Sequence, residues 1–316
     1  MSILVTGGAG FIGSLLCQSL LDKGMEVVCV DDFNGYYNPK FKENNIKNFS
    51  KNKNFHLFRI DITEINKLNY VFKKNEVEII LHLAARAGVR ASIENPELYE
   101  KVNVLGTLNL LNLARDFKIK NFVFGSSSSV YGSIKETPFS EDMKTDTPIS
   151  PYAATKKSGE LMCYAYSSIY GIPMTCLRLF TVYGPRGRPD MAPYKFTQLI
   201  HEGKELPIYG DGKSKRDYTF VDDIVSGFMA CLEKQFKFEV INLGNSNPIE
   251  LKTLISLIEK NAGKKAKIKN LPMQPGDVEI TYADIKKAKR LLGWEPEVRI
   301  EEGIKKTVEW YKNERL

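Results

Sequence analysis

The glycines near the start of the chain constrain its fold more than any other feature of the sequence. An apolar segment at residues 3–5 leads to Gly7, Gly10 and Gly13, and a helical pattern of apolar residues follows them directly. Glycine lets the backbone turn sharply and approach a pyrophosphate, whose charge is bound by the free N–H groups of a helix N-terminus. The order of strand, glycines and helix therefore predicts a dinucleotide-binding unit, with a glycine-rich turn that binds no ligand as the alternative.

The second predicted strand, at residues 27–30, ends at an acidic side chain. Asp31 follows it directly, at the position where a carboxylate accepts hydrogen bonds from the adenosine ribose of a dinucleotide. Asp31 and Asp32 would repel the 2′-phosphate of NADP, and no arginine follows immediately to attract it. We therefore predict that the cofactor is NAD.

The composition is that of an ordinary globular protein. The chain has 316 residues, of which 43% are apolar and 26% are charged, which suits one large core and a smaller lobe. No apolar run reaches the roughly 18 residues of a membrane span, and the first strand begins after Met1 and Ser2, which leaves no room for a signal segment. The five cysteines are scattered without a CxxC pair, so we expect them to be reduced and the protein to be cytoplasmic.

Charge and histidine content argue against two further kinds of ligand. The net charge of +7 could attract nucleic acid, but the lysines are spread along the chain among acidic residues, so no nucleic-acid partner is expected. His56, His82 and His201 have no metal-binding spacing, so no metal site is expected. His82 lies in an apolar strand, where a structural role is the better interpretation.

Apolar segments of strand length recur along the first part of the chain, and helical patterns lie between most of them. This alternation predicts an α/β fold, a Rossmann-type doubly wound parallel sheet with right-handed crossovers and ligands at the carboxyl edge. The predicted strands span residues 3–5, 27–30, 55–60, 79–83, 122–124 and 174–179, and the helices 11–23, 64–74, 97–117 and 153–170.

After about residue 181 the pattern loosens into short strands, loops rich in Gly and Pro, and helices near 193–202, 222–233, 250–261 and 300–312. We predict an NAD-binding domain at residues 1–180 and a smaller C-terminal nucleotide-sugar-binding lobe at 181–316. Part of the lobe, near 216–245, is expected to return to the main domain, because residues 239–243 are apolar enough to join its sheet. The polar insertion at residues 40–54 is expected to be a surface loop or helix.

Tyr152 and Lys156 lie four residues apart on one predicted helix and so share a face. A tyrosine ordinarily has a pKa of about 10. An adjacent ammonium and the positive nicotinamide of NAD would stabilise the phenolate and make it a usable base near neutral pH. A partly buried tyrosine beside a solvated lysine is the alternative, and the upstream glycine pattern favours catalysis.

With these motifs the chain resembles, over nearly its whole length, the extended short-chain dehydrogenase/reductases of the nucleotide-sugar epimerase and dehydratase branch. The resemblance implies a tightly bound NAD that is regenerated in each turnover, with Tyr152 as the base, Lys156 as its ribose-binding partner and Ser127 as the hydroxyl that bonds the sugar 4-oxygen. It also implies a homodimer, because the helices at 97–117 and 153–170 match those that pair in the family's dimers. The implied NAD contacts are Gly7, Gly10, Phe11, Ile12, Gly13, Asp31, Asp32, Asp61, Ile62, Leu83, Ala84, Ala85, Asn103, Tyr152 and Lys156.

The two residues after Ser127 indicate the reaction class. The related sugar 4,6-dehydratases have Asp and Glu there, and the related uronate decarboxylases have Glu at the second position. Here the residues are Ser128 and Ser129, which cannot serve as general acid or base near neutral pH. The reaction that this resemblance implies is C4 epimerisation of a UDP-sugar through a transient 4-keto intermediate.

Three local features resemble UDP-glucuronate 4-epimerases: residues 86–96, Thr181 and residues 184–191. Arginine suits a planar carboxylate, so we place Arg188 at the sugar C6 carboxylate; alternatively, Arg186 and Arg188 contact only phosphate or solvent. UDP-glucose or UDP-N-acetylglucosamine as substrate, and a non-catalytic NAD-binding regulator, remain alternative functions. The predicted substrate contacts are Arg86, Ser127, Ser128, Ser129, Thr181, Arg188, Tyr209 (stacking on the base), Arg216 and Asp277 (the last two at the nucleotide diphosphate and its ribose).

Overall fold

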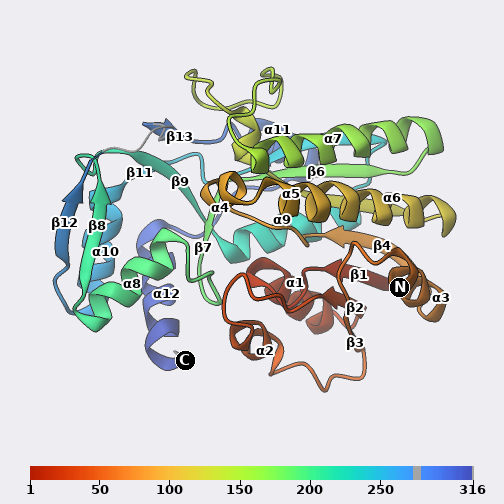
Figure 1. Ribbon diagram of the computed structural model, residues 1–316, viewed down its shortest axis with the longest axis horizontal. Helices are drawn as coiled ribbons and strands as arrows, with labels where there is room; N and C mark the ends of the chain where they lie inside the picture. The colour runs from red at the N-terminus through yellow and green to blue at the C-terminus, as the bar shows by residue number, and fades with distance from the viewer. Residues whose placement is uncertain (273–278, 315–316) are drawn as a thin grey trace.

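The computed structural model describes residues 1–272 and 279–314, and its largest element is a seven-stranded sheet in the order β10-β6-β5-β4-β1-β2-β3 (Figure 1). All neighbouring strands in it are parallel. The Rossmann-type doubly wound sheet predicted from the sequence is thus confirmed. The strands are β1 (Ser2–Thr6), β2 (Glu26–Asp31), β3 (Phe55–Arg59), β4 (Val77–His82), β5 (Asn121–Ser127), β6 (Met174–Leu179) and β10 (Phe238–Leu243).

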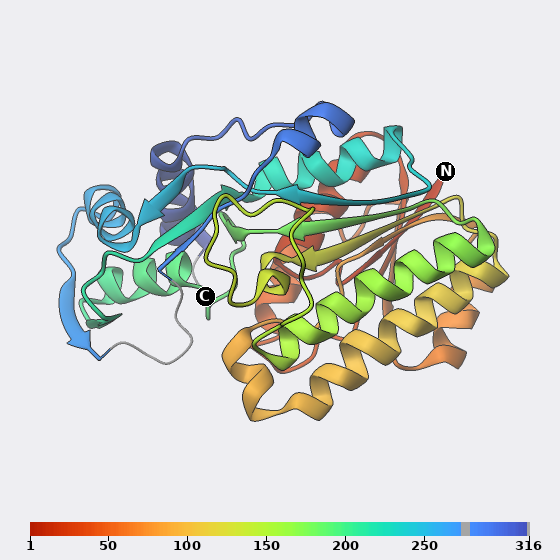
Figure 2. The same ribbon diagram turned by 90° about the horizontal axis from the view of Figure 1, so that it is seen from above.

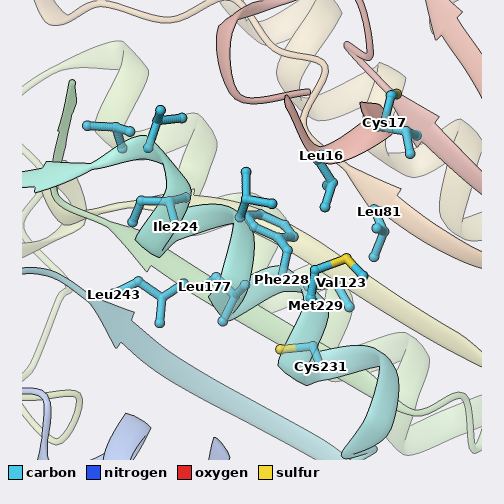
Figure 3. Packing of buried hydrophobic residues seen from close by; sticks show 14 of the residues in the cluster. Leu16, Cys17, Leu81, Val123, Leu177, Ile224, Phe228, Met229, Cys231 and Leu243 are labelled. Atoms are coloured by element: carbon cyan, nitrogen blue, oxygen red, sulfur yellow. The ribbon is translucent and has the colours of Figure 1, made fainter. Parts of the chain in front are cut away.

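Helices cover both faces of this sheet, as Figure 2 shows from above. In Figure 3, Leu16 of α1 and Phe228 of α9 lie over the strand residues Leu81 and Val123 on one face. Because helices cover both faces, every residue of β1 and β5 is buried, instead of every second residue as in a strand with one solvated face. One face carries α1 (Phe11–Asp22), α9 (Val221–Glu233) and α11 (Lys286–Leu292), and the other α3 (Ile65–Lys74), α6 (Gly106–Asp116) and α7 (Pro151–Tyr170).

The structure is helical over the stretch predicted at residues 97–117, but a π-helical turn interrupts the α-helix. This stretch consists of α5 (Pro96–Tyr99), a π-helical turn (Glu100–Leu105) and α6. A π-helical turn accommodates an extra residue, so side chains before and after it point in different directions. Helix α7, by contrast, begins at Pro151 after the N-cap residue Ser150, whose hydroxyl accepts a hydrogen bond from the Ala153 N–H. This cap fixes Tyr152 in the first turn.

The smaller lobe, on the left of Figure 1, was predicted only as helices and unplaced short strands. Its strands are β7 (Thr181–Tyr183), β9 (Lys215–Phe220), β11 (Pro248–Glu250) and β13 (Ile280–Thr281) in one sheet, and β8 (Glu205–Tyr209) beside β12 (Lys267–Leu271). Its helices are α8 (Ala192–Glu202), α10 (Leu251–Ala262) and α12 (Ile300–Glu314), which pack around a separate apolar cluster that includes Phe196, Leu254 and Ile304.

Between these elements the chain returns to the main sheet. Strand β10 pairs with β6 from Phe238 to Leu243, as the apolar residues 239–243 predicted. The insertion at 40–54 contains a short helix, α2 (Lys40–Ile46), followed by a loop. A second short helix, α4 (Val89–Glu94), lies after β4 and was not predicted. Within residues 1–272 and 279–314, no helix combines the length and apolarity that a membrane crossing requires.

A buried carboxylate, Glu160, ties α7 to both β6 and the end of β5. Arg178 donates from Nε and Nη2 to the two carboxylate oxygens of Glu160, at 2.8 and 2.9 Å, and the Ser126 hydroxyl donates to Glu160 at 2.7 Å. Burial acts to raise the pKa of Glu160, but the hydrogen bond and charge of Arg178 outweigh it, so the pKa is lowered and the group stays ionised. The residues that follow Ser126 are therefore held at a fixed position relative to α7.

Candidate active site

A cavity of about 410 Å³ lies at the carboxyl edge of the main sheet, where the loops after its strands meet. This is the edge at which ligands were expected. Most of the residues predicted to bind cofactor or substrate line it: Gly7, Gly10, Phe11, Ile12, Gly13, Asp31, Asp32, Asp61, Ile62, Leu83, Ala84, Ala85, Arg86, Ser127, Ser128, Ser129, Tyr152, Lys156, Thr181 and Arg188.

Asn103 lies behind the cavity wall instead of in its lining. Its side chain accepts a hydrogen bond from the Arg86 N–H at 2.7 Å and donates to the Arg86 carbonyl and the Thr155 hydroxyl, each at 3.0 Å. The Arg86 guanidinium donates to Asn34 at 2.8 Å. Asn103, in the π-helical turn, thus holds the loop after β4 in place, and its contact with NAD stays a prediction.

Two further predicted substrate contacts, Tyr209 and Arg216, do not line this cavity. Tyr209 is at the end of β8, and the guanidinium carbon of Arg90 lies 5.0 Å from the centroid of its ring. Arg216, on β9, donates to the main-chain carbonyl of Lys215. Asp277 lies outside the described residues.

The glycine turn fits the diphosphate of a dinucleotide. Gly7 has a φ of +68°, and a Cβ there would lie 2.8 Å from the Ala84 nitrogen. A Cβ at Gly13 would lie 2.1 Å from the Gly7 carbonyl oxygen. Neither position admits a side chain, so the backbone of this turn is open to a ligand at the N-terminus of α1.

Asp31 is held by groups that the sequence pattern did not reveal. It is only 4% exposed and accepts hydrogen bonds from the Ala9 and Phe33 N–H groups and from Lys42 Nζ at 2.7 Å. Lys42 also lies 3.5 Å from Asp32 and lines the cavity. Because Lys42 comes from α2, within the insertion, no spacing in the sequence linked it to Asp31. The two acidic charges near the expected adenosine ribose are therefore partly balanced.

The environment of Tyr152 differs from the predicted one. Burial raises the pKa of its hydroxyl, while a hydrogen bond with Ser127 and the charge of Arg188 act in the opposite direction. Lys156 instead donates to the main-chain carbonyl of Gly125 at 2.6 Å, and burial lowers its pKa to about 8. In the protein alone, Ser127 and Arg188 are thus the groups that favour the phenolate, and Lys156 is aimed at the end of β5.

The serines after β5 form a small hydrogen-bonded turn. Ser127 Oγ donates to Ser129 Oγ at 3.0 Å and accepts from the Ser129 N–H at 3.2 Å, and Ser128 begins a 3₁₀ turn. Ser127, Ser128 and Ser129 all line the cavity without a carboxylate among them. This part of the wall can donate and accept hydrogen bonds but cannot remove a proton from carbon.

The two arginines of the loop after β7 point to different places. Arg188 lines the cavity and donates to Asp190 from Nε at 3.0 Å and from Nη2 at 2.5 Å. Burial acts to lower the pKa of Arg188, but Asp190 outweighs it, so the guanidinium remains charged. Arg186, with a φ of +64°, reaches the Ser14 hydroxyl on α1 at 3.4 Å.

His82 has the structural role that its position in an apolar strand predicted. Its ring nitrogens lie 2.7 Å from the Thr6 hydroxyl and 2.9 Å from the Thr107 hydroxyl. Burial lowers its pKa to about 3, so the ring is neutral near pH 7.

Known proteins are similar to this chain over almost its whole length. The family described as GDP-mannose 4,6 dehydratase matches residues 4–307. A UDP-glucuronate 4-epimerase from Thermodesulfobacterium geofontis is 48% identical over 310 residues, which are 98% of this chain and 95% of the relative.

Two solved structures share the fold. A UDP-glucuronic acid 4-epimerase from Bacillus cereus in complex with UDP-glucuronic acid and NAD has 40% identity and a TM-score of 0.92, with 99% of each chain covered. A UDP-glucose 4-epimerase from Thermotoga maritima with UDP-glucose has 34% identity and a TM-score of 0.90, again with 99% of each chain covered. The fold is thus shared by proteins named for an acidic sugar and for a neutral one.

The pairing of Asp31 with Lys42 leads to a prediction about cofactor choice. Asp31→Asn removes one negative charge and leaves Asp32 as the acidic partner of Lys42, so the site repels a 2′-phosphate less. We expect affinity for NADP relative to NAD to rise about tenfold, measured by calorimetry with both cofactors. Asp22→Asn, an exposed substitution on α1 outside the cavity, is the matched control and should leave the ratio unchanged. If the unaltered protein binds NADP as well as NAD, Asp31 does not select the cofactor.

Proposed function

The chain belongs to the GDP-mannose 4,6-dehydratase family of NAD-dependent short-chain dehydrogenase/reductases, and we propose that it is a 4-epimerase that interconverts UDP-glucuronate and UDP-galacturonate. The observation that carries the proposal is the composition of one cavity wall. Tyr152, Ser127 and Arg188 face the same cavity, and the two side chains that follow Ser127, those of Ser128 and Ser129, line it as well.

When bound in this cavity, NAD would supply the hydride acceptor, and in its reduced form the hydride donor, for C4 of the sugar. Tyr152 takes the proton of the 4-hydroxyl as the 4-keto sugar forms and gives it back on reduction, with Ser127 hydrogen-bonded to it. The glycine turn at Gly7 would hold the diphosphate, and Asp31 the adenosine ribose. Lys156 would hold the other ribose, next to the carbonyl that it binds.

Epimerisation is the reaction that these side chains can complete. Elimination of water across C5 and C6 requires a general acid and a general base beside those carbons. Ser128 and Ser129 line the cavity and stand at the sequence positions of the Asp and Glu of the related dehydratases, and a serine hydroxyl serves as neither acid nor base near neutral pH. Tyr152 and the cofactor suffice for oxidation and reduction at C4.

Arg188 favours an acidic sugar. The guanidinium lines the same cavity as Tyr152, and its charge acts to lower the pKa of the Tyr152 hydroxyl. C6 of a pyranose is only a few bonds from C4, so a C6 carboxylate would meet Arg188, with Ser128, Ser129 and Thr181 as neutral hydrogen-bonding groups around it. The 4-keto uronate is a β-keto acid, and a fixed carboxylate whose bond to C5 lies near the carbonyl plane is prevented from leaving as carbon dioxide.

A panel of UDP-sugars tests this proposal. The purified protein is incubated with NAD and, separately, UDP-glucuronate, UDP-glucose and UDP-N-acetylglucosamine, and the products are identified by proton NMR. We expect UDP-galacturonate from UDP-glucuronate at the highest kcat/KM. Preferred turnover of a neutral sugar would support the alternative substrates. Bound NAD without turnover of any sugar would support a non-catalytic regulator.

We further propose that the enzyme is a cytoplasmic homodimer. The five cysteines are free, as a reducing compartment would leave them. Helix α7 exposes Leu161 and Tyr164 one turn apart, and Leu105 is exposed just before α6. The two helices run side by side along the rim of the molecule in Figure 2. Exposed apolar side chains on adjacent helices suit burial against the same face of a second copy.

Removal of the Tyr152 hydroxyl tests the base. Tyr152→Phe keeps the ring and should lower kcat by about 10² to 10⁴-fold, because general-base catalysis is lost, while binding of NAD and UDP-glucuronate measured by calorimetry stays nearly unchanged. Tyr166→Phe is the control, since Tyr166 lies on the same helix but donates to Asn112, outside the cavity. Activity of Tyr152→Phe within a few fold of the parent would remove Tyr152 from the base role.

Removal of the Arg188 guanidinium tests whether the substrate is an acidic sugar. Arg188→Ala should lower kcat/KM for UDP-glucuronate by about tenfold to a hundredfold, because a charge-assisted hydrogen bond is lost, and should affect UDP-glucose much less. The fraction of product decarboxylated to a UDP-4-keto-pentose should rise. If kcat/KM fell by the same factor for both sugars and no decarboxylated product formed, Arg188 would instead bind the diphosphate or stabilise its own loop.

The dimer is tested by light scattering coupled to size exclusion. Leu161→Glu places a charge in the proposed interface and should convert the dimer to a monomer. Ile268→Glu, on exposed strand β12 of the other lobe, is the matched control. A parent protein that is monomeric at micromolar concentration, or a dimer that survives Leu161→Glu, contradicts this interface.

A further inference from the structure

The hydrogen bonds of Arg188 use only one of the two edges of its guanidinium group. A guanidinium can bind a carboxylate through its side edge, Nε and one Nη, or through its end edge, the two Nη atoms. Asp190 occupies the side edge, through Nε and Nη2. None of the hydrogen bonds made among the described residues involves Nη1 of Arg188. The end edge therefore stays available while Asp190 is in place.

Tyr36 limits the motion of the same pair. The guanidinium carbon of Arg188 lies 5.6 Å from the centroid of the Tyr36 ring. The Tyr36 hydroxyl donates a hydrogen bond to Asp190 at 3.5 Å. Tyr36 lines the cavity and belongs to the loop after β2, which also carries Asp32. Arg188 is thus held by an acidic group on one edge and by an aromatic face on one side.

Building on the proposed function, we propose that Asp190 is a positioning residue for uronate selectivity: it holds the side edge of Arg188 and thereby presents the end edge to the C6 carboxylate of the sugar. A guanidinium that is already fixed loses less conformational entropy when the substrate binds than one on a freely rotating side chain. If Asp190 instead competes with the substrate for the Arg188 guanidinium, its removal should increase the affinity for the uronate.

The experiment measures KM and kcat for UDP-glucuronate and UDP-glucose, at saturating NAD, in the parent and in Asp190→Ala. Asp190 is an exposed loop residue, so the substitution should leave the fold intact. We expect the KM for UDP-glucuronate to rise about tenfold, with kcat within about threefold of the parent and the KM for UDP-glucose nearly unchanged. In an Arg188→Ala background, Asp190→Ala should cause no further change, because Asp190 acts through Arg188.

Asp116→Ala is the matched control, since Asp116 is exposed at the end of α6, pairs with the Nε of Arg115 at 2.7 Å and does not line the cavity. A lower KM for UDP-glucuronate in Asp190→Ala would show competition and overturn the proposal. Equal KM increases for both sugars, or an additional loss in the Arg188→Ala background, would assign Asp190 to general loop structure and also overturn it. If the parent turns over UDP-glucuronate normally in these assays, such a failure leaves the proposed function intact; a parent without uronate turnover refutes both.

Discussion

The active-site cavity depends on the parallel pairing of the central strands. Parallel strands end at the same edge, so the loops after β1, β2, β4, β5 and β6 converge although they are far apart in the sequence. Parallel sheets need cover on both faces, and the two helical layers of Figure 2 provide it. A slip of one residue in any of these pairings would turn every side chain of that strand to the other face. The position of Tyr152 relative to the glycine turn therefore follows from sheet register.

Within this frame, Glu160 joins the two segments that carry the chemistry, and Arg178 of β6 keeps it ionised. Glu160 lies on α7 with Tyr152 and Lys156, and it binds Ser126, the residue before the serine turn. Loss of one partner from a buried pair costs about 3–5 kcal/mol, because the other charge remains buried. Glu160 thus fixes the serine turn against the helix that carries Tyr152, and a small shift between the two would alter the position of C4 relative to Tyr152.

The parts of the site that the sequence predicted are those with a local pattern. The glycines, Asp31 and the Tyr152–Lys156 pair each stand at a fixed spacing on one strand, turn or helix. Lys42 and Asp190 were not predicted, because each acts on a residue through a contact that only the folded chain creates. The short strands expected in the smaller lobe could not be placed, because they are only two to six residues long and pair across long stretches of chain. The π-helical turn was missed because its apolar residues continue the periodicity of the flanking helices.

The central claim is that C4 is oxidised and then reduced by the same bound cofactor, with Tyr152 exchanging only the hydroxyl proton. The most direct measurement uses UDP-glucuronate with deuterium at C4 and follows the product by NMR. The account predicts UDP-galacturonate that retains deuterium at C4 and acquires no solvent hydrogen at C4 or C5. Loss of the deuterium to solvent, or exchange at C5, would contradict it, because the inversion would then proceed by proton abstraction from carbon.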